Sequence, residues 1–168
     1  MTTVDAHVLG VINARYGYMS EHFSIEELTF SSTAQRLGIN NTPDPTILES
    51  MTNILIPGME RVRSVLLEPM HIDSGYRCLT LNQAIGGAEH SAHMDGLAAD
   101  FIAPAYGSPK LIVSVLIANK EAIGFHRLIE EGTWVHIDFP PAGQPPDYLV
   151  LTAHFGPAGT TYSQGARA

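Results

Sequence analysis

Alternating apolar and polar side chains predict several short β-strands in the second half of the chain. The alternation is cleanest over residues 133–139, where the apolar positions would face a core. The opposite side of that strand carries Trp134, His136 and Asp138. The same pattern predicts further strands at residues 71–74, 97–103, 127–130 and 148–155. Strands 127–130 and 133–139, joined around Gly132, would complete an antiparallel sheet.

Residues that begin helices predict where several helices start. Ser24 and Glu27 fit a capping box, in which each side chain satisfies a backbone N–H at a helix start. Ser108 as N-cap and Pro109 in the first turn begin another helix. These two starts predict helices at residues 25–29 and 108–120. A further helical segment is predicted at residues 79–85.

A longer apolar run with helical spacing covers residues 48–65, and Pro57 interrupts it. Proline in a helix interior costs about 3 kcal/mol, because it lacks an N–H and its ring meets the preceding turn. We therefore expect either a kink or two helices with Pro57 near the start of the second. The predicted fold is α+β: a small antiparallel sheet with helices packed on one face and a cleft on the other.

The chain has the length of one small domain. Its 168 residues and 45 % hydrophobic content fit a single globular unit. We expect an N-terminal arm at residues 1–22, a main domain at residues 23–139 and a C-terminal extension at residues 140–168, packed on or trailing from that domain. Within the extension, a strand would be followed by a mobile end.

Two histidines and an aspartate outline a zinc site. His93 and Asp100 stand seven positions apart across Gly96, and His136 follows on a predicted strand. Asp100 would project from the face of its strand opposite to Phe101. Catalytic zinc usually takes three such ligands and leaves a fourth position for water, whose pKa falls to about 7. We expect one Zn²⁺ per chain at these residues.

The order of these motifs resembles the zinc D-Ala-D-Ala carboxypeptidase and hedgehog-like metallopeptidase superfamily, and within it the small phage and prophage peptidases of bacterial cell walls. The resemblance covers about residues 23–139. It depends on three motifs in order: SGYR at residues 74–77 followed by Asn82, S-x-H-x-x-G-x-A-x-D at residues 91–100, and a glutamate shortly before W-x-H at residues 134–136.

The resemblance assigns roles to individual residues. His93, Asp100 and His136 match the family's zinc ligands, and Arg77 matches the arginine that contacts the substrate's carbonyl or carboxylate. In several members the catalytic acid stands three residues before the last histidine, but here that position is Thr133. We therefore predict Glu131 as the general base, with Glu130 as the alternative.

Four further residues lie close to these motifs in the sequence. Ser91 and Trp134 are predicted to contact substrate in the cleft. His90 lies three positions before His93. It is expected at the cleft rim, with ligation of the metal as the alternative. Asp138 is either a solvated strand residue or a group that orients a ligand histidine.

Charge and composition exclude some classes of partner. With a formal net charge of −8 and nine Lys plus Arg residues, the chain offers no basic surface for nucleic acid. Its single cysteine cannot form an internal disulfide. We find no signal-peptide pattern and no 18-residue apolar run. We therefore expect synthesis in the cytoplasm and no membrane insertion. We also expect a monomer. The protein would act at the cell wall after release or as part of a phage particle.

The expected function is a zinc peptidase that cleaves peptidoglycan stem peptides next to D-amino acids. It could act as a D-Ala-D-Ala carboxypeptidase or as an L-Ala-D-Glu or cross-bridge endopeptidase. The alternative is a non-catalytic zinc-containing module for binding or virion structure. Retention of Arg77 and Glu131 favours the enzyme, because a purely structural zinc site needs neither residue.

Overall fold

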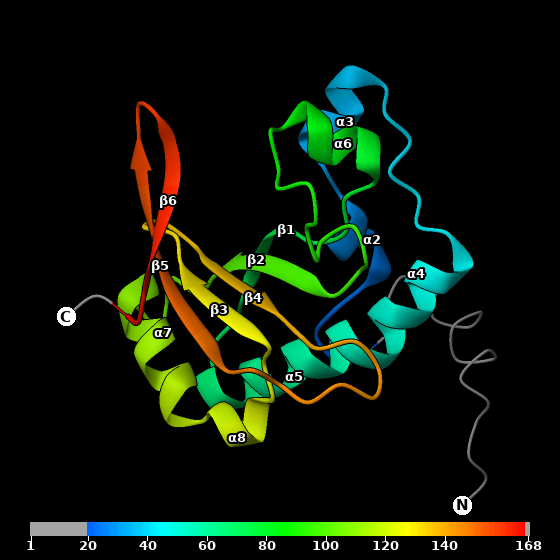
Figure 1. Cartoon of the computed structure of the whole chain (residues 1–168). Coiled ribbons are helices and arrows are strands. Elements are labelled where there is room, and N and C mark those ends of the chain that lie inside the picture. Colours follow the sequence, from blue (N-terminus) through cyan, green and yellow to red (C-terminus); the bar gives the residue numbers. More distant parts are fainter. Residues whose placement is uncertain (1–19, 167–168) are drawn as a thin grey trace, which may run out of the picture.

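A six-stranded β-sheet forms the centre of the computed structural model, which describes residues 20–166 (Figure 1). The strands are β1 (His71–Ser74), β2 (Ala98–Ile102), β3 (Arg127–Glu130), β4 (Val135–Asp138), β5 (Leu149–Gly156) and β6 (Gly159–Gln164). They lie in the order β1-β2-β4-β3-β5-β6. The predicted α+β fold is confirmed, and the strands predicted over residues 71–74 and 127–130 have these same bounds.

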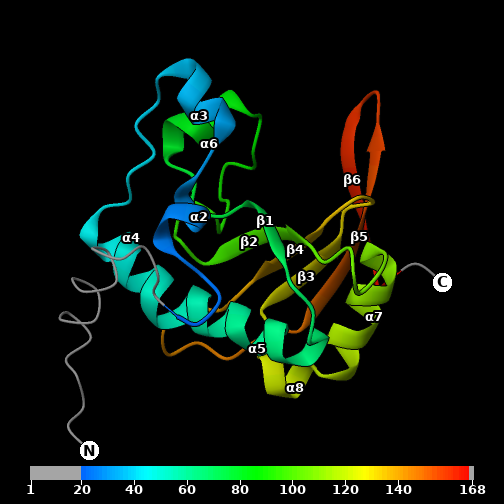
Figure 2. The same ribbon diagram turned by 180° about the vertical axis from the view of Figure 1, so that it is seen from behind.

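Helices precede and alternate with the strands. They are α2 (Ile25–Thr29), α3 (Ser32–Leu37), α4 (Pro45–Ser50), the π-helix η1 (Met51–Leu55), α5 (Ile56–Leu66), α6 (Leu79–Ala84), α7 (Pro109–Ala118) and α8 (Lys120–Ile123). Helices α5, α7 and α8 lie along one face of the sheet, whereas α3 and α6 lie together at the far side of the molecule (Figures 1 and 2). Among the described residues, no helix combines the length and apolar character needed to cross a membrane.

The hydrophobic core fills the space between the sheet and the helices α5 and α7. It contains the inward side chains of β2 and β4, including Phe101 and Ile137, and the buried faces of the helices, including Met59 and Leu116. All four side chains are 2 % exposed or less. Because side chains alternate along a strand, this packing turns Asp100 and His136 to the opposite face of the sheet.

The helical run around Pro57 divides into helices α4 and α5, with Pro57 near the start of the second. This is one of the two predicted alternatives. Helix α4 passes into the π-helical turn η1, and Pro57 lies in the first turn of α5. Proline is tolerated in the first turn of a helix because an N–H there would have no partner within that helix. The wider π-helical turn accommodates the missing N–H without ending the helical run.

Two features of the C-terminal part differ from the prediction. The sheet is not purely antiparallel, because β5 pairs parallel with β3, with Arg127 opposite Leu149. The chain leaves β4 at the Arg127 end of β3, so β5 begins at that same end and runs alongside β3. The expected mobile end is also wrong for residues 159–164, which form β6. This strand is exposed along its length and is held by pairing with β5. Its sequence therefore shows no alternation of buried apolar and exposed polar positions.

The register of the sheet places one row of side chains across the exposed face. Ser74 lies opposite Asp100, Asp100 opposite His136, His136 opposite Ile129, and Ile129 opposite Leu151. Paired residues in neighbouring strands point to the same face of the sheet. The row therefore collects side chains from five strands that are distant in sequence.

Gly96 connects the loop that carries His93 to strand β2. Its φ is +67°, and the backbone N–H of Leu97 closes the turn by donating to the carbonyl of Ala92 at 3.0 Å. A Cβ at this position would lie 2.7 Å from Cγ of Met51 and 3.0 Å from Cγ2 of Ile47. Only glycine satisfies both the backbone angle and the space.

We expect Gly96→Ala to destabilise the protein more than Gly38→Ala. Both glycines have positive φ, near +65°, but nothing lies within 4 Å of a Cβ added at Gly38. Both changes incur the left-handed backbone cost of about 1–2 kcal/mol. Gly96→Ala adds overpacking of about 1–3 kcal/mol. Urea unfolding of the metal-free variants measures the difference, and equal losses at the two positions would show that the packing around Gly96 is not tight.

Candidate metal centre

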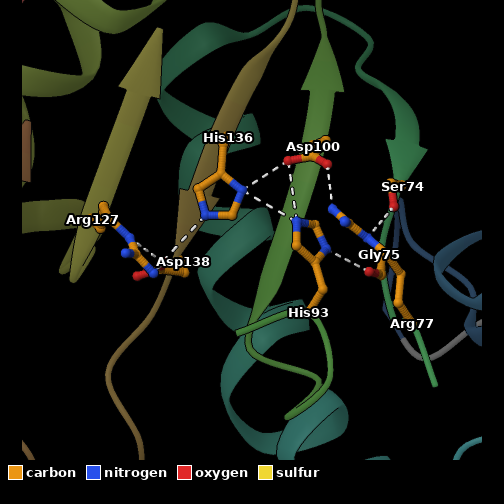
Figure 3. A network of polar contacts seen from close by, with 8 residues as sticks. All are labelled: Ser74, Gly75, Arg77, His93, Asp100, Arg127, His136 and Asp138. Atoms are coloured by element: carbon orange, nitrogen blue, oxygen red, sulfur yellow. Dashed lines mark hydrogen bonds and ion pairs between the residues drawn. The ribbon is translucent and has the colours of Figure 1, made fainter. Parts of the chain in front are cut away.

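His93, Asp100 and His136 meet on the face of the sheet that points away from the hydrophobic core (Figure 3). Nε2 of His93 lies 3.2 Å from Oδ1 of Asp100 and 3.2 Å from Nδ1 of His136. Nδ1 of His136 lies 2.8 Å from the same Asp100 oxygen. The three side chains are 13 % exposed or less. The structure thus gathers the three residues predicted as zinc ligands into one buried triangle of donor atoms.

The triangle fits a small tetrahedral metal ion. Zinc binds imidazole nitrogen and carboxylate oxygen at about 2.0–2.2 Å, which separates tetrahedral ligand atoms by about 3.3 Å. The donor atoms found here lie 2.8–3.2 Å apart, so a small outward movement of one side chain would complete the geometry. Two imidazoles and one carboxylate are also a donor set that zinc accepts in catalytic sites.

Each histidine is oriented by an oxygen on its far side. Nδ1 of His93 donates to the carbonyl of Gly75 at 2.6 Å, and Nε2 of His136 donates to Oδ2 of Asp138 at 3.2 Å. Metal-binding histidines almost always donate their second ring N–H to such a carbonyl or carboxylate, which fixes the ring and its tautomer. Of the two interpretations of Asp138, the structure supports the one that orients a ligand histidine, since its side chain is 1 % exposed.

The local fold explains why these groups meet. Asp100 and His136 are paired residues in β2 and β4, so the sheet itself brings them together. His93 comes from the loop before β2, and its carbonyl accepts the backbone N–H of Arg77 at 3.2 Å. A Cβ at Gly75 would lie 2.2 Å from the carbonyl oxygen of Leu28, so only glycine lets this segment pack closely enough to reach His93.

Arg77 joins the cluster through Asp100. Its Nη2 donates to Oδ2 of Asp100 at 2.8 Å, and its Nε donates to Oγ of Ser74 at 3.0 Å. The guanidinium therefore holds the Asp100 oxygen that does not face the histidines. Its five N–H donors are only partly used by these two bonds, and it also lines the cavity above the cluster.

Burial and close contact shift the ionisation of the cluster. Burial lowers the pKa of His93, and it would do the same to His136. However, hydrogen bonds to Asp100 and Asp138 outweigh burial and raise the pKa of His136 to about 9. Burial acts to raise the pKa of Asp100, but the two histidines hold it well below its usual range. A metal ion bound at these residues would displace any proton from the ligand nitrogen of His136, because a metal-binding imidazole nitrogen must be deprotonated.

A cavity of about 440 Å³ opens above the cluster. Its walls include the residues predicted to act on substrate, namely Arg77, Ser91, Glu131 and Trp134. His90 also lines the cavity and is exposed, and it is not part of the group of donor atoms. This position at the rim is the one predicted.

Of the two candidate bases, Glu131 faces the cavity. Glu130 is 4 % exposed and is not among the residues that line the cavity. The two glutamates are consecutive, and Gly132 turns the chain directly after Glu131, with φ of +74°. Burial raises the pKa of Glu131, and the negative charge of Asp100 adds to this effect. A carboxyl whose pKa is raised in this way is suited to proton transfer near neutral pH.

Several residues of the site were not predicted from the sequence. Ile129, Leu151 and Tyr162 also line the cavity, and the last two belong to the C-terminal hairpin. Arg127 lines it as well, and its Nε and Nη2 both donate to Oδ2 of Asp138 at 2.8 Å. The alternation in strand 127–130 could have indicated that Arg127 and Ile129 share a face. No pattern in the sequence indicates that β5 pairs with β3, which is what brings Leu151 beside Ile129.

Comparison with known proteins identifies the family. The sequence model of the family described as Peptidase M15 matches residues 21–138, which include all the residues of the cluster and both arginines. A search of curated proteins gives no match to the chain. The matched region contains the three donor residues, and the structure brings them together in one cleft. The chain therefore belongs to the peptidase M15 family.

Proposed function

We propose that this peptidase is zinc-dependent and hydrolyses the stem peptides of peptidoglycan next to D-amino acids, as a carboxypeptidase or an endopeptidase. The observation that carries the proposal is the triangle of His93, Asp100 and His136 at the floor of a cleft that also contains Glu131 and Arg77. The substrate class is supported by the similarity to cell-wall peptidases of the family. We also propose that the protein acts at the bacterial cell wall.

The residues of the cleft divide the chemistry of peptide hydrolysis among them. When bound at the three donor residues, zinc would act as a Lewis acid toward the peptide carbonyl and the attacking water. The carboxylate of Glu131 accepts the proton that the water loses as its oxygen bonds to the carbonyl carbon. The same carboxyl then delivers that proton to the leaving amine as the C–N bond breaks.

Arg77 is placed to stabilise the negative charge that develops on the carbonyl oxygen. It is held by Asp100 and Ser74 and needs no reorganisation during the reaction, and its remaining N–H groups are available to an oxyanion. Burial lowers the pKa of the guanidinium, but the charge of Asp100 opposes that shift. Because an arginine side chain stays protonated in proteins, Arg77 remains a cation while it acts.

The observations favour an enzyme over a non-catalytic zinc module. A structural zinc site normally has four protein ligands and no open cavity beside it. Here three donor residues lie at the base of a cavity of about 440 Å³ that is lined by a carboxylate and a guanidinium. These features suit turnover.

Digestion of purified sacculi tests the proposed function directly. We expect the zinc-loaded protein to release stem-peptide fragments whose masses identify the scissile bond. Cleavage should stop when a chelator removes the metal and return when Zn²⁺ is added. If intact sacculi and soluble stem peptides both remain uncleaved at full zinc occupancy, the proposed substrate class is wrong.

Zinc binding should depend on the buried histidines and not on the rim histidine. We expect His93→Ala and His136→Ala each to abolish stoichiometric zinc binding, because each removes one of three ligands. His90→Ala is the matched control and should bind zinc like the wild type, since His90 lies outside the donor group. Metal analysis after dialysis measures the content. Stoichiometric zinc in either of the first two variants would place the metal elsewhere.

Glu131→Gln should retain zinc and the fold but lose about 100-fold to 10,000-fold in kcat, the range that general acid–base catalysis supplies. Glu130→Gln, the neighbouring control, should change kcat little, because Glu130 does not line the cleft. Steady-state hydrolysis of a soluble stem peptide, with zinc content measured in parallel, gives the comparison.

The pH profile supplies an independent check on Glu131. The base must be deprotonated to act, so activity should fall as pH decreases through its pKa. Burial raises the pKa of Glu131 and a bound metal cation would oppose that shift, so the check is that this acid limb is absent from the residual activity of Glu131→Gln. Full activity of the Glu131→Gln and Glu130→Gln variants, and of the double variant, would exclude both residues as the base.

A further inference from the structure

The β5–β6 hairpin extends beyond the rest of the sheet. Strand β5 pairs with β3 only as far as Thr152, which lies opposite Glu130 at the end of β3. From Ala153 to the turn after Gly156, β5 pairs only with β6. The hairpin therefore projects from the sheet as a two-stranded ribbon, which both views show (Figures 1 and 2). At its base, Thr152 anchors it by donating from Oγ1 to the carbonyl of Gly165 at 2.8 Å.

One face of the hairpin is directed toward the cleft. Tyr162 lies opposite Ala153, so it shares a face with Leu151 and Phe155, which stand two positions away on either side of Ala153. Leu151 and Tyr162 both line the cavity above the metal centre. Phe155 packs against Trp134, with ring centroids 5.8 Å apart, and Trp134 lines the same cavity.

Opposite the hairpin, the cavity is lined by the segment that follows helix α6, residues 85–88. Asn82 fixes this segment by donating from Nδ2 to the carbonyl of Ala88 at 2.8 Å. The cleft therefore has a floor provided by the sheet and two walls, one formed after α6 and the other formed by the hairpin. A peptide lying over the metal centre would pass between these walls.

The hydroxyl of Tyr162 is available to a ligand. The side chain is 52 % exposed, and its hydroxyl makes no hydrogen bond to any other residue that the structure describes. Burial of its ring and the negative charge of Glu131 raise the pKa of the phenol, so it remains a proton donor at neutral pH. Tyrosine is well suited to such contacts because it combines a large apolar ring with one polar end.

The hairpin lies outside the part of the chain that matches the family. The family model ends at residue 138, whereas β5 begins at Leu149. The donor residues, Arg77 and Glu131 all come from the matched part, so the shared core holds the groups proposed for the chemistry. The second wall of the cleft comes from residues beyond the matched part. Loops and hairpins that border a reaction centre commonly carry the residues that bind substrate.

We propose that the β5–β6 hairpin is a substrate-binding wall and that Tyr162 determines specificity by donating a hydrogen bond to a carbonyl or carboxylate oxygen of the bound stem peptide. This inference rests on the proposed function, because it names a contact made by that same substrate. Leu151 and the Trp134–Phe155 pair supply the apolar surface on which the peptide backbone and its alanine methyl groups lie.

Kinetic analysis of Tyr162→Phe and Tyr162→Ala tests the proposal. Loss of one hydrogen bond should raise KM for a soluble stem pentapeptide about 3-fold to 10-fold in Tyr162→Phe, with kcat within about 2-fold of the wild type. Tyr162→Ala should raise KM further, because the ring contact is lost as well. Thr161→Ala is the matched control, since Thr161 lies opposite His154 on the other face of the same hairpin. Its KM should not change.

Binding can be followed separately from turnover. Trp134 is the only tryptophan of the chain and lines the cleft, so its fluorescence reports occupancy of the site. In a Glu131→Gln background, Tyr162→Phe should weaken binding of the pentapeptide by the same factor as it raises KM. Zinc content and thermal stability should match those of the background protein, because the side chain of Tyr162 is half exposed and holds no other group.

The outcomes distinguish this inference from the proposed function. If the wild type cleaves the pentapeptide but KM and binding are the same in both Tyr162 variants, the hairpin does not contact substrate and the inference is wrong, while the proposed function stands. A fall in kcat at unchanged KM would also overturn it. If the wild type neither binds nor cleaves the pentapeptide, the proposed function fails and this inference fails with it.

Discussion

The pairing of β2 with β4 is the constraint on which the site depends. It sets Asp100 directly opposite His136, and their side chains point away from the core because their neighbours, Phe101 and Ile137, point into it. A shift of one residue in this register would send both polar side chains into the hydrophobic core. The burial of large apolar residues on one face of the sheet therefore determines that the donor atoms lie together on the other face.

The remaining contacts serve to hold that pair in a low-dielectric environment. His93 reaches the pair only because glycines at positions 75 and 96 allow two loop segments to pack against helices that carry Leu28 and Met51. Buried carboxylates are costly unless they are paired and hydrogen-bonded. Here each carboxylate has its own cation. Arg77 binds the Asp100 oxygen that faces away from the histidines, and Arg127 binds Oδ2 of Asp138, the same oxygen that accepts from His136.

In the proposed function, the groups that carry out the chemistry and the walls that contact substrate come from different parts of the chain. The donor residues, the two arginines and Glu131 come from strands and loops within the region that matches the peptidase M15 family. Their positions are fixed by the sheet and leave little freedom. The walls of the cleft come from the segment after α6 and from the projecting hairpin, whose outer part pairs only within itself.

The sequence by itself determined the fold class, most strands and the three donor residues, because these follow from short-range patterns. Alternation along residues 133–139 is set by burial on one face, and the spacing of His93 and Asp100 is set by one glycine turn. Only the tertiary structure decided which glutamate faces the cleft, because Glu130 and Glu131 are adjacent and identical in chemistry and the Gly132 turn separates them. It also decided the role of Asp138 and the place of Tyr162. Both depend on pairings between strands distant in the chain, and β6 carries no burial pattern that a sequence could reveal.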